Sequence, residues 1–434
     1  MVDLTALVAP MQYLPDELLA TIFQVASRER STGPDWRYQS SKQLPVPMVI
    51  SSVSRRWRHV ALTTPGLWAH IRVPIWRPRN WPRFALERSG THPIDVILDY
   101  RNHQCPTADS IQTTLSLVLP HVQRWNGFTL IADHGMILKA IGQQLADLHC
   151  PTLRDLRFSL TGRGTQTDQH VTIPRIFSGG APHLTHVRVD SVALAWSSPS
   201  LTGLTTLDLR WLWSDTKLSY DQFQILVLNS PGLTTLILRG CYVQLSPTNQ
   251  YPIIQTPALR HLEISGDSVC GMLWLLDTPA LQSLVLANVD EGEFRELGQS
   301  LQTTTRRSRY PSLRSLTLLN VSTSQPTEGF LEVLSTITDL TIINSASDGF
   351  VHVLRAHSCP NGTYKPPAFP QLRCFTLLHD VDMETLFDVV ENRARHGCPL
   401  RRLVVYAGSL NEQYKALFQQ YLTVDGVYYR TEDQ

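Results

Sequence analysis

One short pattern recurs from about residue 150 onward and decides the fold. It reads PALRHLEI at residues 257–264, PALQSLVL at 279–286 and PSLRSLTL at 311–318. Each copy has a proline, a leucine two positions later, and two more apolar residues at intervals of three and two. The same spacing starts at Pro151, Pro182, Pro231 and Pro370. With 28 prolines and 42% apolar residues, chance would give only roughly two matches against these seven, so the repeat is real.

Three further units keep the apolar triplet but lose or shift the proline: LTTLDL from Leu204, ITDLTI from Ile337 and LRRLVV from Leu400. Successive units then lie 20 to 35 residues apart, which is the range of leucine-rich repeats with irregular unit lengths. The first apolar residues of the units are Leu153, Leu184, Leu204, Leu233, Leu259, Leu281, Leu313, Ile337, Leu372 and Leu400. PIDVILDY from Pro93 and RWNGFTLI from Arg124 are candidates for degenerate first turns.

The physics of the unit predicts its structure. The last two apolar residues are two apart, so they point to one face of a short strand and are buried. A proline before the unit stops the preceding helix. Intervening stretches such as 221–230 (DQFQILVLNS) and 383–397 (METLFDVVENRARHG) have apolar spacings of three and four that favour helices. We therefore predict an α/β solenoid, with a parallel strand ribbon on the concave side and helices and turns on the convex side.

One feature leaves the curvature of this solenoid open. The asparagine or cysteine expected at the ninth position of each unit is kept only as Cys241. Elsewhere the position is apolar or differently polar, as at Val192, Val289 and Val321. The inner polar ladder of a regular horseshoe is therefore incomplete.

Composition excludes several classes of protein. The 434 residues include 38 Lys+Arg against 37 Asp+Glu, so the chain as a whole has no bias toward nucleic acid or anionic membranes. No secretory signal and no run of about 18 apolar residues is evident. The seven cysteines are scattered and form no CxxC motif. We therefore expect them to be reduced, mostly buried thiols. We expect a cytoplasmic or nuclear location.

The motifs of common catalytic sites are missing. The sequence contains no GxSxG nucleophile elbow, no Walker loop and no HExxH zinc motif. His183 and His186 are three apart, but His186 falls on a predicted strand, which argues against a helical zinc pair. We therefore expect no enzyme activity, no catalytic residues, no metal site and no cofactor.

The N-terminal region has a different pattern. LPDELLATIF at residues 14–23 opens with Leu-Pro and two acids, and its apolar residues 18, 19, 22 and 23 are spaced as one stripe of a helix. A second helix is predicted at about 46–62, with Val49, Val53, Trp57, Val60 and Ala61 on one face. TPGLWAHIRV then forms a turn and an apolar, strand-like end.

These segments resemble the F-box family. LPDELLATIF is similar to the F-box opening, and SVSRRWRHVALTTPGLWAHI at 52–71 to its closing segment. WPRFALERSGTHPIDVIL at 81–98 resembles the segment that joins F-box to repeats in F-box families of mushroom-forming fungi. Residues 28–47 depart from the family pattern, in which this turn is shorter. The expected organisation is an F-box at 10–75, a connecting segment with a possible degenerate first repeat at 76–120, and a leucine-rich-repeat solenoid at 121–430.

The resemblance implies a function. F-box proteins dock on the Skp adaptor of a cullin–RING ubiquitin ligase and recruit a protein target for ubiquitination. By position, the residues that would form or support the docking surface are Leu14, Pro15, Leu18, Leu19, Ile22, Phe23 and Trp57. Two alternatives stay open: these residues fill the helices' own core, or the helices only cap the open end of a scaffold solenoid that has no ligase role.

The target would bind the strand side chains that alternate with the buried ones. The expected contact residues are charged in the first units and apolar in the last: Arg157, Arg188, Asp208, Arg210, Arg239, Glu263, Leu319, Ile343 and Leu378. We expect the charges to orient a target and the apolar patch to supply burial. The alternative is that the C-terminal tail, YYRTEDQ, or a loop covers the apolar group.

A local charge bias supports a third hypothesis. Nine arginines lie between Arg55 and Arg101, interleaved with Trp57, Trp68, Trp76 and Trp81. Such a pattern can bind RNA, with cations on phosphates and rings on bases. The arginines can equally stack on the tryptophans within the fold or face an acidic protein, and we expect neither nucleic acid nor membrane among the partners.

Overall fold

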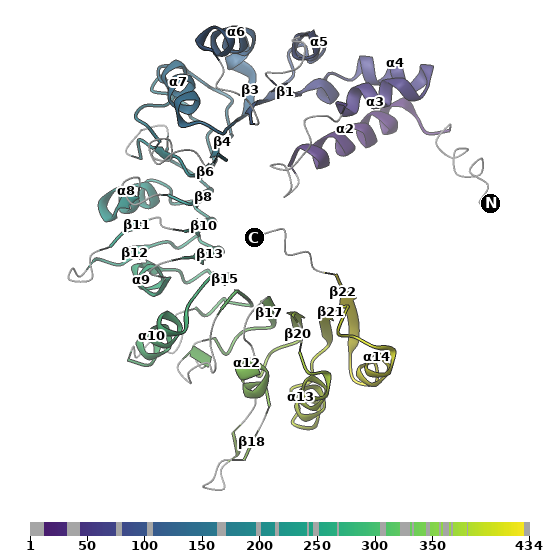
Figure 1. Ribbon diagram of the computed structural model, residues 1–434, viewed down its shortest axis with the longest axis vertical. Coiled ribbons are helices and arrows are strands. Elements are labelled where there is room, and N and C mark those ends of the chain that lie inside the picture. The colour runs from purple at the N-terminus through teal and green to yellow at the C-terminus, as the bar shows by residue number, and fades with distance from the viewer. Residues whose placement is uncertain are drawn as a thin grey trace. The chain divides into compact units, whose positions relative to one another are not determined.

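The computed structural model describes most of the chain. The residues described are 13–32, 44–74, 80–101, 107–162, 171–196, 201–212, 217–240, 243–245, 251–266, 269–303, 310–321, 330–331, 334–343, 348–355, 357–358, 364–365, 368–379 and 381–428. The chain divides into two compact units, Met1–Thr202 (unit 1) and Gly203–Gln434 (unit 2). Both are mixed α/β structures built on parallel strands (Figure 1).

Unit 1 begins with helices and continues with alternating strands and helices. Its helical segments are α2 (Asp16–Thr32), α3 (Val46–Val53), α4 (Arg55–Thr63), η2 (Pro65–Trp68), α5 (Asn80–Arg88), α6 (Ala108–Val118), η3 (Leu119–Arg124) and α7 (Gly135–Leu145). Its strands are β1 (His70–Pro74), β2 (Ile94–Tyr100), β3 (Trp125–Ala132), β4 (Asp155–Leu160), β5 (Thr172–Ile173), β6 (His186–Asp190) and β7 (Ala193–Leu194).

The main strands of unit 1 pair in parallel in the order β1, β2, β3, β4, β6. The segments at Pro93 and Arg124, which were candidates for degenerate first turns, therefore contain strands of the ladder, β2 and β3. Their inward residues form two registered rows, and one of these is Ile71, Val96, Phe128, Leu156 and Val187. All five are buried, because alternate residues of a strand point to the same face.

The prediction of one helix at 46–62 is wrong. Ser54 has extended backbone, with φ −155° and ψ 168°, and separates α3 from α4. Its side chain accepts a hydrogen bond from the Trp57 backbone N–H and so caps α4. The break changes the face that is buried: Val60 and Ala61 are in the core, whereas Val49 and Val53 are exposed.

Unit 2 repeats the strand and helix alternation. Its strands are β8 (Thr206–Arg210), β9 (Leu218–Ser219), β10 (Thr235–Arg239), β11 (Val243–Gln244), β12 (Ile254–Gln255), β13 (His261–Ser265), β14 (Leu276–Asp277), β15 (Ser283–Ala287), β16 (Ser315–Leu319), β17 (Asp339–Ile343), β18 (His357–Ser358), β19 (Tyr364–Lys365), β20 (Cys374–Leu378), β21 (Arg402–Tyr406) and β22 (Thr423–Val427). Its helices are α8 (Tyr220–Leu228), α9 (Val269–Leu275), α10 (Glu291–Thr303), α12 (Asp348–Val353), α13 (Met383–Arg395) and α14 (Glu412–Phe418).

The long ladder of unit 2 runs β8, β10, β13, β15, β16, β17, β20, β21, β22, and every pair is parallel. The first apolar residue of each predicted repeat unit is buried throughout the chain, from Leu153 in unit 1 to Leu400 in unit 2. The helices predicted at 221–230 and 383–397 are confirmed as α8 and α13. The repeat pattern therefore predicted the strands, their inward faces and these two helices.

A left-handed residue follows each of several strands. Asn288 and Asn320 come directly after β15 and β16 with φ of 54° and 51°, and the Asn320 side chain donates to the Asn288 side chain at 3.0 Å. Gly240 and Gly266 hold the same place after β10 and β13. A Cβ on Gly240 would lie 2.7 Å from the Trp211 ring, so only glycine fits. The next residue, Val289 or Val321, is buried where a regular repeat has asparagine.

Arg393 is a buried cation in unit 2. It projects from α13, and its guanidinium donates to the carbonyls of Leu354, Ala368 and Phe369 at 3.2, 2.8 and 2.9 Å. Burial lowers the pKa of this guanidinium to about 10. One arginine thus supplies hydrogen-bond donors to three backbone carbonyls. These bonds hold Leu354, Ala368 and Phe369 against α13.

The cysteines behave as packed thiols. Cys150 and Cys270 are buried, and burial raises the pKa of each to about 12. Cys374 and Cys398 are half-buried and free, while Cys105, Cys241 and Cys359 lie outside the described residues. Within the described part of the chain, no helix combines the length and hydropathy required to cross a bilayer.

Candidate protein-binding surfaces

Helix α2 has two apolar stripes rather than the single one predicted. Leu19 and Phe23 point into the core and are 0% and 3% exposed, whereas Leu18 and Ile22 are 50% and 43% exposed. Val25 continues the outer stripe and is 50% exposed. These three residues are spaced i, i+4, i+7, so they line one side of the helix. Of the four docking residues expected on α2, Leu19 and Phe23 therefore belong to the core, whereas Leu18 and Ile22 stay accessible to a partner.

The neighbouring helix adds to this accessible surface. Met48, Val49 and Val53 on α3 are exposed, and α3 packs against both α2 and α4. We call the exposed apolar residues of these two helices the α2–α3 surface; its members are Leu18, Ile22, Val25, Met48, Val49 and Val53. Pro15, just before α2, is also exposed, and Leu14 is half-buried.

Contacts between α2 and α4 explain why the α2–α3 surface takes no part in the packing of the helices. Phe23 packs on Trp57 with ring centroids 4.8 Å apart, and this contact joins α2 to α4. Arg56 of α4 forms an ion pair with Asp16 at 2.7 Å and also donates to the Leu14 carbonyl. The core of the three helices is therefore complete without the α2–α3 surface.

The outward face of the unit 1 ladder is charged. One row across the strands contains His70, Asp95, Gly127, Asp155 and His186. The next row, two residues along each strand, contains Arg72, Ile97, Thr129, Arg157 and Arg188. Arg157 is half-buried and pairs with Asp155 at 2.7 Å. The arginines predicted at 157 and 188 thus lie side by side on neighbouring strands.

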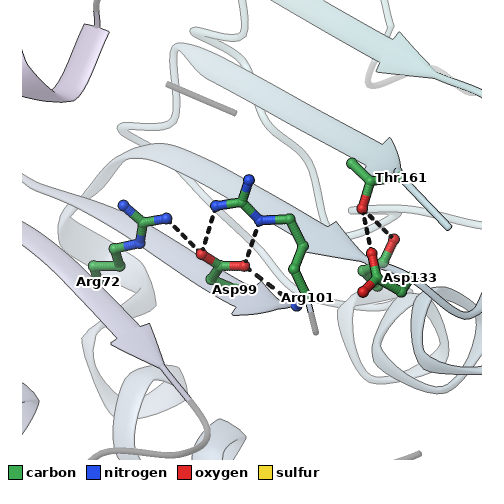
Figure 2. Close-up of polar contacts among 6 residues, drawn as sticks. Arg72, Asp99, Arg101, Asp133 and Thr161 are labelled. Atoms are coloured by element: carbon green, nitrogen blue, oxygen red, sulfur yellow. Dashed lines mark hydrogen bonds and ion pairs between the residues drawn. The ribbon is translucent and has the colours of Figure 1, made fainter. Parts of the chain in front are cut away.

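Asp99 is the centre of a small polar network at the ends of these strands. Arg101 reaches both of its carboxylate oxygens at 2.9 Å, and Arg72 contacts one of them at 2.5 Å (Figure 2). Burial raises the pKa of the Asp99 carboxyl, but the hydrogen bonds and charges of Arg101 and Arg72 outweigh burial and leave it below its ordinary value. At the ends of β3 and β4, Thr161 donates to Asp133 at 2.5 Å.

Asp95, two rows earlier on β2, is held in a similar way. His70 contacts its carboxylate at 2.9 Å and Asn126 donates to it at 2.8 Å. Burial raises the pKa of Asp95, but the hydrogen bond with His70 and the charge of that ring prevail, and the pKa is lowered overall. The acids of this face are therefore engaged as acceptors of neighbouring side chains.

The charged residues predicted on β8, β10 and β13 of unit 2 are engaged with one another. Asp208 and Arg210 are 5% and 8% exposed and form a two-pronged pair at 2.7 and 2.9 Å. Glu263, 7% exposed, pairs with Arg239 of the neighbouring strand. We expected these four residues to offer charge to a target. Their burial and mutual pairing leave Arg239, which is half-buried, as the most accessible of them.

On β16, β17 and β20 of unit 2, two of the outward rows are uncharged. Leu319, Ile343 and Leu378 are in register on β16, β17 and β20, and each is half-buried. Thr317, Thr341 and Thr376 form the adjacent row and are also half-buried. Val404 of β21, in register with Thr376, is buried. The apolar residues predicted for target binding are thus brought together, while most of the tail, 429–434, lies outside the described residues.

Several described side chains of the arginine and tryptophan segment contact other residues of unit 1. Trp68 is buried and donates to the Ala61 carbonyl at 2.7 Å. Arg88 lies over the Phe84 ring at 5.1 Å, and Arg56, Arg72 and Arg101 contact acids. Trp76, Arg77 and Arg79 lie outside the described residues. The described rings and cations contact one another more than they form an open surface for bases.

Sequence reasoning missed two features of these surfaces. The exposure of Val25, Met48, Val49 and Val53 was not foreseen, although the spacing of Val25 from Leu18 and Ile22 was a readable signal. The network of Asp99 with Arg72 and Arg101 had no signal, because its register depends on the pairing of β1 with β2.

A comparison of the chain with models of protein families and with curated proteins found no match.

Proposed function

We propose that this protein is the substrate-recruiting adaptor of a Skp–cullin–F-box ubiquitin ligase. In this proposal α2, α3 and α4 form an F-box that binds the Skp adaptor, and the strand ladders are leucine-rich repeats that bind a protein target. The observation that carries the proposal is the α2–α3 surface, whose apolar side chains stay exposed although the three helices already pack together.

The energetics of such a surface suit a protein partner. Burying one leucine or isoleucine fully is worth about 1.5–3 kcal/mol, so two or three of these residues can anchor an interface. Exposed apolar groups on neighbouring helices are typical of protein-binding sites. Within the proposal, Leu18, Ile22 and Pro15 contact the Skp adaptor, while Leu19, Phe23 and Trp57 hold the helices in place.

The test is capture of the full chain by a purified Skp adaptor. The variant Leu18→Ala/Ile22→Ala removes two exposed anchors without touching the core, and we expect it to weaken binding roughly a hundredfold. The matched control is Ile225→Ala/Leu228→Ala, which truncates two exposed apolar residues of α8. Wild-type binding that is absent, or that is equally strong in the α2 variant, would refute the adaptor role.

A second function is favoured by one observation. Helix α2 packs against η2 and β1, the first strand of the unit 1 ladder. In a scaffold protein with no ligase role, these helices would serve only to cover that end of the repeats. The two functions differ in outcome: a pure cap predicts no capture by the Skp adaptor and a lower unfolding temperature of unit 1 when α2 is mutated in its core, as in Leu19→Ala.

A further inference from the structure

The strands of unit 2 begin along an edge that is rich in arginine. Arg260, Arg314, Arg373 and Arg401 each occupy the position directly before a strand, namely β13, β16, β20 and β21. All four side chains are exposed. We call this set the arginine row.

Backbone hydrogen bonds show that these positions are adjacent. Gln282 donates to the Arg260 carbonyl, Arg314 to Gln282, and Thr338 to Arg314, at 2.8, 2.9 and 2.8 Å. Arg373 then donates to the Thr338 carbonyl at 2.8 Å, and Arg401 to Arg373 at 2.7 Å. The row is therefore continuous across six neighbouring strands, β13 to β21, and arginine occupies four of the six places.

The charge of the arginine row is not balanced within the described residues. None of the four arginines forms an ion pair with any residue in that part of the chain. The first residues of the same strands, from His261 to Arg402, include one acid, Asp339. Asp425 lies farther along β22 and pairs with Arg402 at 2.8 Å. This edge therefore has an excess of positive charge.

This excess is unfavourable for the fold itself. Arg373 and Arg401 are hydrogen-bonded neighbours, and like charges on adjacent strands destabilise a sheet. A structural explanation would be that the arginines neutralise the carbonyl ends of helices. The guanidinium of Arg314 instead donates to the carbonyls of Leu313 and Thr336, which lie in turns. Within the described residues, the side chains of Arg260, Arg373 and Arg401 have no such hydrogen bonds to offset the cost of the row, and this points to a ligand.

The spacing of the row suits an acidic polypeptide. Neighbouring strands lie about 4.8 Å apart. Arg260, Arg314 and Arg373 precede every second strand, so each is roughly 10 Å from the next, and an extended peptide covers that distance in about three residues. Binding of single-stranded nucleic acid relies on rings that stack on bases. Tyr310 and Phe369, four residues before Arg314 and Arg373 in the sequence, are buried, which argues against bases as the ligand.

We propose that the arginine row of unit 2 binds an acidic segment of a partner protein, one with carboxylates or phosphates spaced along an extended chain. The inference deepens the proposed function, on which it rests for the identification of that partner as the target. The contact itself depends on unit 2 alone. Attraction by the row acts within roughly 8–10 Å at physiological ionic strength, so binding weakens as salt is added.

The test uses the full chain and a fluorescein-labelled oligo-glutamate peptide, with fluorescence anisotropy as the readout. The variant Arg260→Gln/Arg314→Gln/Arg373→Gln/Arg401→Gln is expected to weaken peptide binding by at least roughly tenfold. The control Arg295→Gln/Arg355→Gln/Arg395→Gln/Lys415→Gln removes the same charge from four acid-paired side chains of unit 2, and we expect less than about a twofold change.

Several results would overturn the inference. Equal binding by the row variant, or equal weakening in both variants, would show that the row is not a site. Tighter binding of oligo-uridylate that is lost in the row variant would make it a nucleic-acid surface. A lower unfolding midpoint with unchanged peptide binding would assign the arginines to the fold. Capture of the row variant by the Skp adaptor is measured separately, so a failed adaptor role and a failed row remain distinguishable.

Discussion

The outward faces of the two units differ while their inward faces are alike. In unit 1 the outward rows contain Arg72, Arg157 and Arg188 among aspartates and histidines. In the later strands of unit 2 the same places are taken by threonines and by Leu319, Ile343 and Leu378. Inward rows in both units are leucine, valine, isoleucine and phenylalanine, all buried.

This difference separates the inward residues, which form the core of the ladder, from the outward residues, which form its surface. Stacked parallel strands need apolar inward rows, because each unit buries its neighbour's face. The outward side chains are free of that requirement and can be charged or apolar without changing the backbone pairing. A partner would therefore meet two chemically distinct surfaces on equivalent strands.

The strongest test of this separation is truncation of one inward residue in each unit. We expect Phe158→Ala in unit 1 and Phe375→Ala in unit 2 to lower the free energy of unfolding by about 3–5 kcal/mol each, because both rings are fully buried. Urea denaturation followed by circular dichroism measures the loss. A loss below about 1 kcal/mol in either variant would show that the inward rows are not equivalent.

A smaller effect is expected from the charged face of unit 1. Asp99→Asn removes the ionised acceptor of Arg72 and Arg101, and we expect a loss of about 2 kcal/mol in the free energy of unfolding at neutral pH. Because the folded pKa of Asp99 is lowered, its stabilisation is present above the pKa of the unfolded chain and is lost as pH falls through the folded pKa.

The pH dependence supplies the control for this prediction. Wild type and Asp99→Asn should become equally stable in strong acid, and a constant difference at all pH values would contradict the assignment. Asp425→Asn serves as the matched variant in unit 2, since Asp425 also pairs with an arginine but is 41% exposed. We expect its effect to stay below about 1 kcal/mol.

The smallest change in stability is expected on the apolar outward row. The variant Leu319→Thr/Ile343→Thr/Leu378→Thr keeps residues that suit strands, and each site is only half-buried, so we expect less than about 1 kcal/mol per site. Once a target has been identified, its binding should weaken in this variant but not in Thr317→Ser/Thr376→Ser. A large loss of stability would mean that the row belongs to the core.

Much of the fold could be predicted from the sequence, and less of the binding surfaces. The apolar triplet located the strands from β4 to β21 and their inward residues, because a period of two is a local property of the chain. The helix break at Ser54 escaped prediction, since valines continue the helical spacing across it. The exposure of the outer stripe of α2 was also not predicted, because it depends on which side of α2 is covered by α4.

Local periodicity alone determined which residues of each strand face inward, since burying them is the only way for the repeats to stack. Tertiary structure decided which outward residues remain available. It buried Asp208, Arg210 and Glu263 in mutual pairs, and it aligned four distant arginines along one edge. These outcomes depend on strand register and on neighbours far away in the chain, and local spacing contains no information about either.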